Sequence, residues 1–179
     1  MKSIGLIRRL DELGRIVMPK ELRRALNVRE GDPLELCPRE DGILVRKYSP
    51  LNTMRRHLAV PCVASLQKAL PSASGIIITD CDGILSYTPG MPRLSLSKEY
   101  SDFLRNERPR LYITPPKFAP ISIDDGCSNQ YTQIIHSILS SDGLYGSIIV
   151  RYPVGTMMPN EDKLAIELAA NLLAVSVEC

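Results

Sequence analysis

Residues 5–24 read GLIRRLDELGRIVMPKELRR, and this stretch decides how the N-terminal part of the chain folds. Two short apolar runs, at 6–7 and 16–18, flank the polar segment 11–14. Gly14 ends that segment, and glycine readily adopts the positive φ values that tight connections need. The pattern therefore predicts a strand, a turn and a second strand.

A short helix is expected directly after the second strand. Pro19 suits the first turn of a helix, where its missing N–H would have no partner. Asn27 tolerates the left-handed conformation of a helix C-cap, so we expect the helix to reach about this residue. At about 100° per residue, its apolar side consists of Leu22, Ala25 and Leu26, and its opposite side of Lys20, Arg23 and Arg24.

Six cations from this stretch form a candidate binding set, which we call the basic set: Arg8, Arg9, Arg15, Lys20, Arg23 and Arg24. Most charge runs in proteins are simply solvated faces, and this interpretation stays open. Four of the five arginines occur in adjacent pairs, however, and acids are nearly absent from the set. This pattern favours a surface that binds a polyanion such as nucleic acid.

A second hairpin is predicted after the helix. The Asp41-Gly42 pair lies between two strand-like runs, at 33–37 and 43–48, which is a strong hairpin signal. Residues 1–50 then hold four short strands and one helix, and so small a unit struggles to bury enough apolar surface alone. We expect it to exchange strands with a second copy, which would double the basic set across a two-fold axis.

The sequence from Ile7 to Arg23, followed by Gly-Asp-Pro-Leu-Glu-Leu at 31–36, resembles the swapped-hairpin DNA-binding domain of AbrB-type transition-state regulators. The resemblance covers roughly residues 1–50 and implies a β-barrel formed as an interlocked homodimer. It also implies control of transition-state or sporulation genes through double-stranded DNA. The residues that it implies in DNA contact are Arg8, Arg15, Arg23 and Arg24, and we expect Arg9 and Lys20 to assist them.

Composition is consistent with two small domains in a chain of 179 residues. Residues 1–50 hold 11 Lys/Arg and 8 Asp/Glu, whereas residues 51–179 hold 11 and 12, so the basic surplus lies with the basic set. The five cysteines are widely scattered and only two histidines occur, so we expect no metal site and no cofactor. No signal peptide or long apolar run is evident, which predicts a cytoplasmic protein with no membrane partner.

Residues 51–71 are predicted to be a helical segment that links the two domains and supports dimerisation. Leu51, Met54, Leu58 and Pro61 follow each other at three- and four-residue spacing, as in a short helix pair. Pro61 removes a backbone donor, so we expect it to kink or end the first helix. A second helical piece is expected over 62–70.

Residues 54–179 predict an α+β sandwich that resembles a GAF sensory domain. The expected elements are strands at 75–80 and 84–87, a helix at 97–106, long strands at 130–139 and 144–152, and a helix from 159 onward. The resemblance implies further assembly, up to a tetramer. It also implies an unknown small-molecule ligand, for which 115–128 is the candidate lid.

Other chemistry in this second part has simpler explanations. The Asp80-x-Asp82-Gly83 pattern could begin a calcium loop, but the closing ligands are missing and a hairpin turn accounts for it better. We expect His57 to be solvated and His136 to be packed or satisfied by a neighbour.

Two rival functions remain open. Some GAF-fold enzymes reduce methionine sulfoxide with pocket cysteines, and Cys81 and Cys127 lie near the proposed pocket; no adjacent base is visible, and we expect no enzyme activity. Related swapped-hairpin domains also neutralise toxins through a disordered acidic tail, so the chain could be an antitoxin-like interaction module. Its last residues instead predict an apolar, alanine-rich helix.

Overall fold

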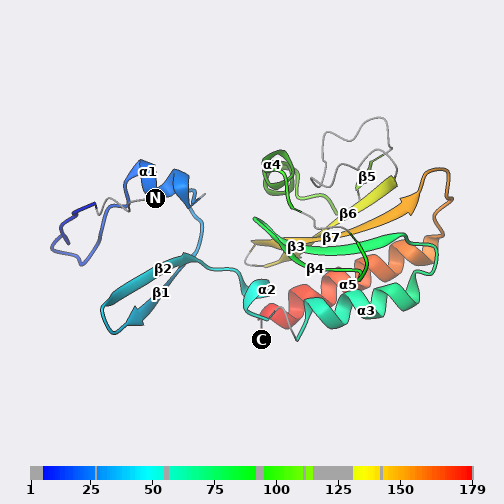
Figure 1. Cartoon of the computed structure of the whole chain (residues 1–179), viewed down its shortest axis with the longest axis horizontal. Helices are drawn as coiled ribbons and strands as arrows, with labels where there is room; N and C mark the ends of the chain where they lie inside the picture. The colour runs from blue at the N-terminus through cyan, green and yellow to red at the C-terminus, as the bar shows by residue number, and fades with distance from the viewer. Residues whose placement is uncertain are drawn as a thin grey trace. The chain divides into compact units, whose positions relative to one another are not determined.

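The computed structural model describes residues 6–26, 28–54, 57–91, 95–110, 112–114, 131–141 and 143–178. The chain divides into two compact units, Met1–Tyr48 and Ser49–Cys179. Both are drawn in Figure 1, and each is described by itself below.

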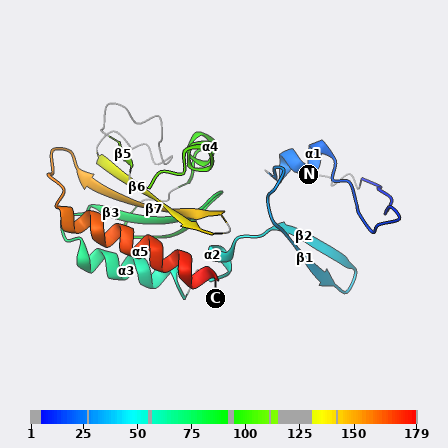
Figure 2. The ribbon, with the colours of Figure 1, turned by 180° about the vertical axis from the view of Figure 1, so that it is seen from behind.

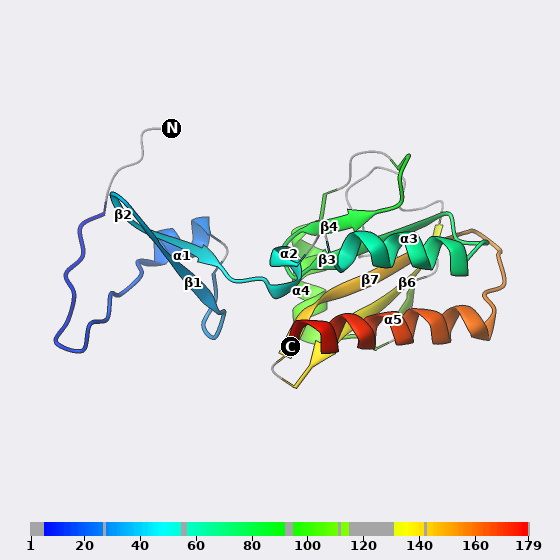
Figure 3. The same ribbon diagram turned by 90° about the horizontal axis from the view of Figure 1, so that it is seen from below.

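The first unit contains one short helix and one hairpin. Helix α1 spans Lys20–Ala25, and strands β1 (Leu34–Arg39) and β2 (Gly42–Lys47) pair antiparallel. The pairing of Arg39 with Gly42 leaves two residues in the hairpin loop, so the predicted second hairpin is confirmed. Figure 3 shows β1 and β2 as a twisted two-stranded ribbon.

The first predicted hairpin is only partly present. The turn at 11–14 forms, but residues 6–10 and 15–19 are assigned to no strand in the single chain. A strand exists only through a ladder of hydrogen bonds to a neighbour, and the described part of the chain supplies none for these segments. Among the described residues of the unit, Pro19 alone is buried. The unit therefore has no hydrophobic core of its own.

The second unit is built on a five-stranded antiparallel sheet in the order β4-β3-β7-β6-β5. Its strands are β3 (Gly75–Asp80), β4 (Ile84–Tyr87), β5 (Tyr112–Thr114), β6 (Tyr131–Ser140) and β7 (Gly143–Pro153). Helices α3 (Ala59–Ala69) and α5 (Asn160–Glu178) lie side by side on one face, and α4 (Lys98–Glu107) covers the other (Figures 1 and 2). This is the predicted α+β sandwich.

Two apolar layers result from the alternation of side chains along the strands. On β3, Ile76 and Ile78 pack towards α3 and α5, whereas Ile77 packs towards α4. Tyr100 and Leu104 supply the buried side of α4. The hydroxyl of Ser97 caps this helix by accepting a hydrogen bond from the Tyr100 N–H at 3.1 Å, so the predicted helix is confirmed.

Helix α5 presents its alanines, not most of its leucines, to the sheet. Its buried apolar residues are Ile166, Ala170, Leu173 and Ala174, and Asp162 in its first turn is buried as well. A second apolar row, which we call the outer α5 stripe, is exposed and consists of Leu164, Leu168, Leu172 and Val175. None of the described helices is long and apolar enough to cross a membrane.

The connection between the units corrects one prediction. Helix α2 spans Pro50–Thr53 and is followed by α3, which begins at Ala59. Pro61 is thus the third residue of α3 and does not end a preceding helix, so that prediction was wrong. The position suits proline, because an N–H in the first turn of a helix has no partner within the helix. Two expected features, the Asn27 cap and the 115–128 lid with Cys127, lie outside the described residues.

Candidate nucleic-acid interface

The turn at 11–15 is a closed ring of local hydrogen bonds. The Asp11 and Gly14 N–H groups donate to the carbonyls of Arg15 and Asp11, each at 3.0 Å. Oδ1 of Asp11 also accepts from the backbone N–H groups of Leu13 at 3.0 Å and Arg15 at 2.8 Å. Gly14 has φ of 73°, a left-handed conformation that costs glycine little. The segment thus forms its turn without help from the rest of the chain.

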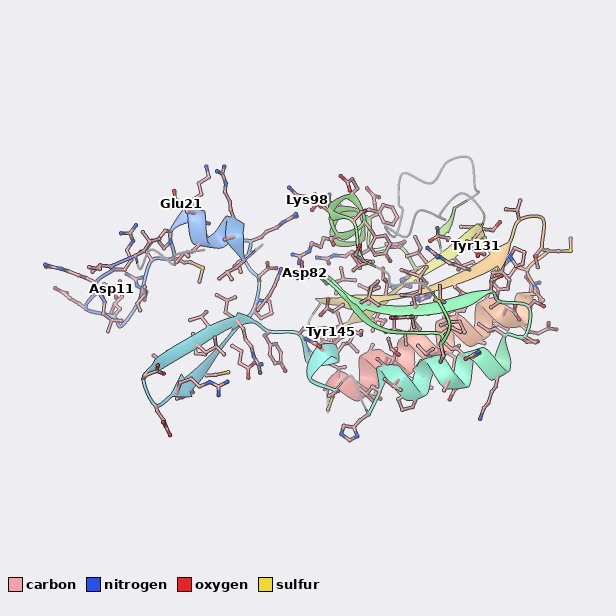
Figure 4. The ribbon with its side chains drawn as sticks, in the orientation of Figure 1. Asp11, Glu21, Asp82, Lys98, Tyr131 and Tyr145 are labelled. Carbon is pink, nitrogen blue, oxygen red and sulfur yellow. The ribbon has the colours of Figure 1, made fainter. Side chains whose placement is uncertain are left out.

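The same carboxylate holds the side chain of Arg15. The Arg15 Nε–H donates to Oδ2 of Asp11 at 2.7 Å, while the two side chains remain 71% and 40% exposed, respectively. The hydrogen bond from the Arg15 N–H, followed by that from its guanidinium, lowers the pKa of Asp11 below its ordinary value. Asp11 is therefore a carboxylate at neutral pH, and Figure 4 shows it in the loop that precedes α1.

Helix α1 carries the second half of the basic set. Lys20 is its first residue, and Arg23 and Arg24 occupy its last turn. Cations are favourable at this end, because the helix C-terminus carries partial negative charge. The helix buries no residue of its own in the single chain, so its long side chains are all accessible.

All six cations of the basic set are exposed, and among the residues that the structure describes only Arg15 of this set has an ion-pair partner. Within the residues that the structure describes, the other five form no ion pair; Arg8 donates from Nη1 to the neighbouring Ile7 carbonyl at 3.1 Å. The hairpin cations differ, because Arg46 contacts Glu35 at 2.7 Å and Lys47 contacts Asp32 at 3.0 Å. Two of the three hairpin cations, Arg46 and Lys47, are thus neutralised within the unit, whereas most of the basic set is available.

The basic set is spread along the first part of the unit. Its members come from three local pieces: the segment before the turn, the end of the turn, and α1. With no shared core between these pieces, their convergence on one surface remains a prediction.

The sequence analysis missed one residue of this region. Asp11 was predicted only as part of the turn, whereas it also holds Arg15. The available signal was the spacing, since an Asp and an Arg four residues apart across a glycine turn lie within reach of each other.

The candidate sites of the second unit have structural explanations. Oδ1 of Asp80 accepts from the N–H groups of Asp82 at 2.8 Å and Gly83 at 2.6 Å, so the predicted turn is confirmed. His57 is exposed, whereas His136 is buried and donates from Nδ1 to the Ser137 carbonyl at 2.9 Å. Burial lowers the pKa of His136. Both histidine predictions are confirmed.

Two of the described cysteines, Cys62 and Cys81, lie partly buried in the second unit. Cys81 is half-buried, and its Sγ lies 3.5 Å from the carbonyl oxygen of Leu144. Burial raises the pKa of Cys62 to about 11, which keeps that thiol protonated at neutral pH. Among the described residues, no group of three or more His, Cys, Asp or Glu side chains is placed to hold a metal ion.

Comparison with known proteins divides the chain in the same place. Residues 7–52 match the family model described as "Antidote-toxin recognition MazE, bacterial antitoxin". The transition state regulatory protein AbrB of Bacillus subtilis is 50% identical over 50 residues, which are 28% of this chain and 52% of AbrB. The N-terminal unit is therefore of the AbrB/MazE type.

The second unit has the fold of GAF domains. The cofactor-binding GAF domain of the nutrient sensor CodY from Clostridium difficile superposes with a TM-score of 0.55 at 13% identity, over 67% of this chain and 84% of that one. The Thermosynechococcus elongatus PixJ GAF domain gives 0.55 at 12% identity, over 74% of this chain and 89% of that one. At such identities the similarity concerns the fold alone.

One relative spans both units. Stage V sporulation protein T of Bacillus subtilis is 32% identical over 183 aligned residues, which cover 99% of each chain. The suspected resemblance is thereby confirmed, and the chain belongs to the family of stage V sporulation protein T, with an AbrB/MazE-type N-terminal domain followed by a GAF-like domain.

Proposed function

We propose that this chain is a DNA-binding transcription regulator that acts in the cytoplasm on transition-state or sporulation genes. The observation that carries the proposal is the basic set: six exposed cations, five of them without an ion pair within the described residues, in a segment shared with AbrB. In this proposal residues 1–50 bind DNA and residues 54–179 form the GAF-like domain. Residues 51–71 form the helical segment that links the two domains.

Arginine chemistry suits this role. The guanidinium group presents several N–H donors in a plane and engages phosphate oxygens in pairs, whereas lysine acts as a point charge. We assign Arg8, Arg15, Arg23 and Arg24 to DNA contact, with Arg9 and Lys20 as further phosphate contacts. Phosphate contacts position a protein on the duplex, and base edges and groove shape supply the sequence preference.

The active species is proposed to be an interlocked dimer. The first unit exposes apolar side chains along its whole length, among them Ile7, Leu13 and Val17, and such a surface requires a partner. A second copy that completes the missing strand ladders would cover it and bring two basic sets together. The outer α5 stripe supports further assembly of the second unit, up to a tetramer.

The GAF-like domain is the proposed place for a small-molecule signal, because CodY is named as a sensor that binds a cofactor through such a domain. We infer that this chain acts by binding and not by catalysis. Turnover of methionine sulfoxide that disappears in Cys127→Ser would contradict this inference.

The salt dependence of DNA affinity tests the main proposal. If four arginines of both subunits contact phosphates, the slope of log affinity against log salt should approach about −7, at roughly 0.9 per contact. Arg23→Ala/Arg24→Ala removes half of these contacts and should reduce the slope to about −3.5. The measurement is fluorescence anisotropy of a labelled duplex in a salt series.

Lys68→Ala/Lys98→Ala is the matched control, because it removes two exposed cations from α3 and α4 of the other unit. This variant should keep the original slope. A slope near zero for the unaltered chain, or equal slopes for both double variants, would refute DNA binding through the basic set.

An antitoxin role is the second candidate, since the family model that matches residues 7–52 is described by a toxin-recognition function. The relative that spans both units is instead named as a sporulation protein, which favours regulation. Affinity purification from the native host discriminates the two: a stoichiometric small protein partner supports the antitoxin role, and enrichment of specific DNA supports the regulator.

A further inference from the structure

The Arg15 side chain is held by one edge of its guanidinium. Its Nε–H donates to Oδ2 of Asp11 at 2.7 Å, and the backbone N–H of Arg15 donates to Oδ1 of the same carboxylate at 2.8 Å. A guanidinium has five N–H donors, and an Nε contact uses one of them. The edge formed by the two Nη groups is left to pair with two phosphate oxygens at once.

Stability does not explain this arrangement. An exposed ion pair between flexible side chains contributes little to folding, because solvent screens it and both side chains lose freedom. The turn is already closed by the backbone bonds of Gly14 and Arg15 and by the bond from the Leu13 N–H to Asp11. The Nε contact adds a fixed direction for a long side chain, which a binding surface can use.

We propose that Asp11 is a positioning residue for DNA binding, which holds the Arg15 guanidinium so that its Nη edge meets a phosphate group of the duplex. The inference rests on the proposed DNA-binding function and adds a residue of the opposite charge to the binding surface. Asp11 itself contacts Arg15 and not the DNA. Asp11 restricts the Arg15 side chain before binding, so this side chain loses less conformational freedom when the complex forms.

Charge alone predicts the opposite effect of this residue. A carboxylate next to a phosphate-binding arginine repels the DNA backbone, so its removal should tighten binding if electrostatics were its only role. Positioning predicts weaker binding when the carboxylate is removed. The sign of the change therefore separates the two roles.

The key variant is Asp11→Asn in the full chain. Its amide oxygen can still accept the Leu13 and Arg15 N–H bonds, so the turn is retained, but the charge-assisted contact with Arg15 Nε is lost. Glu12→Gln is the matched control, because it removes the same charge from the adjacent exposed residue. The Leu13 and Gly14 amide resonances report whether each variant keeps the turn.

Positioning predicts that Asp11→Asn weakens duplex affinity by roughly 2- to 30-fold, since an exposed pair changes an equilibrium by about 1.4- to 5-fold and a dimer carries two. The salt slope should fall towards that of Arg15→Ala, which loses about two phosphate contacts per dimer and thus about 1.8 in slope. Glu12→Gln should leave the slope unchanged and bind equally or more tightly.

A second comparison assigns the effect to Arg15. In an Arg15→Ala background, Asp11→Asn should no longer weaken binding. The inference is overturned if Asp11→Asn tightens binding as Glu12→Gln does, or if it weakens binding equally with and without Arg15. A wild-type chain with no salt-dependent duplex binding would overturn the proposed function as well, so the two failures are distinguishable.

Discussion

Replacing Val17 by alanine in the full chain tests whether the N-terminal unit builds its core with a second copy. Val17 belongs to the predicted second strand, which finds no ladder partner in the single chain, and its side chain is 76% exposed. If an interlocked dimer buries that exposed surface, the substitution removes apolar contacts mainly from the interface.

The expected magnitude follows from the exposed fraction. Two buried carbon groups contribute about 1.6 kcal/mol, at about 0.8 kcal/mol for each. Scaled by the 76% that is exposed in the single chain, this becomes about 1.2 kcal/mol per subunit and about 2.4 kcal/mol per symmetric dimer. At about 1.4 kcal/mol for each factor of ten, the dimer should dissociate about 50-fold more readily.

Sedimentation of fluorescently labelled protein over a dilution series measures this dissociation. Val154→Ala is the matched control, because it is the same change at a residue that is 58% exposed in the other unit. It should leave dissociation of the dimer unchanged. An unaltered dissociation constant for Val17→Ala, or equal effects of the two variants, would refute the shared core.

Two further predictions concern the second unit. Leu173→Ala opens a cavity in the core and should lower the free energy of unfolding, measured by urea titration, by about 2–5 kcal/mol. Leu172→Ala on the outer α5 stripe should leave that free energy nearly unchanged. It should instead weaken assembly, measured as a smaller average mass in light scattering. Burial lowers the pKa of His136, so the neutral imidazole stabilises the folded state. This contribution to the free energy of unfolding is fully present above the pKa of histidine in the unfolded chain, about 6.5. It is lost as the pH falls through the lower pKa of His136 in the folded chain. Urea titrations at pH 7.5 and 5.5 measure how much free energy of unfolding is lost between the two pH values. This loss should be smaller in His136→Gln than in the unaltered chain. In His57→Gln, where the replaced side chain is exposed, it should equal that of the unaltered chain.

Local signals in the sequence predicted most of the second unit. The Ser97 cap, the turn that begins at Asp80 and the two long strands each depend on residues a few positions apart, so the sequence contains the information directly. The Asp41-Gly42 hairpin of the first unit was predictable for the same reason.

Features that depend on a distant or second partner were harder to predict. The predicted strands on either side of the 11–15 turn need hydrogen-bond partners that the described part of the chain does not provide. Their apolar pattern is visible in the sequence, but the strand that pairs with them is not. Helix α5 has two apolar sides, so periodicity alone does not tell which one packs on the sheet. Whether Pro61 ends one helix or lies in the first turn of the next depends on where α3 begins, which is Ala59. Helix boundaries are poorly determined by the local sequence pattern.

The candidate site was predictable as a set of charges but not as a geometry. The paired arginines are visible in the sequence, whereas the orientation of Arg15 depends on which carboxylate reaches its Nε. Two acids, Asp11 and Glu12, lie within four residues of it, and only the folded turn selects Asp11.

At the junction between the units, two adjacent residues each form a hydrogen bond within their own unit. The Tyr48 N–H donates to the Pro33 carbonyl at 3.0 Å, and the next residue, Ser49, donates from Oγ to Oδ2 of Asp80 at 2.9 Å. Adjacent residues are thus fastened to different units, and the tether between them is as short as a polypeptide allows. A short tether keeps joined binding modules at a high effective concentration, so in the proposed assembly we expect binding of one N-terminal unit to DNA to confine the search of the next to nearby DNA.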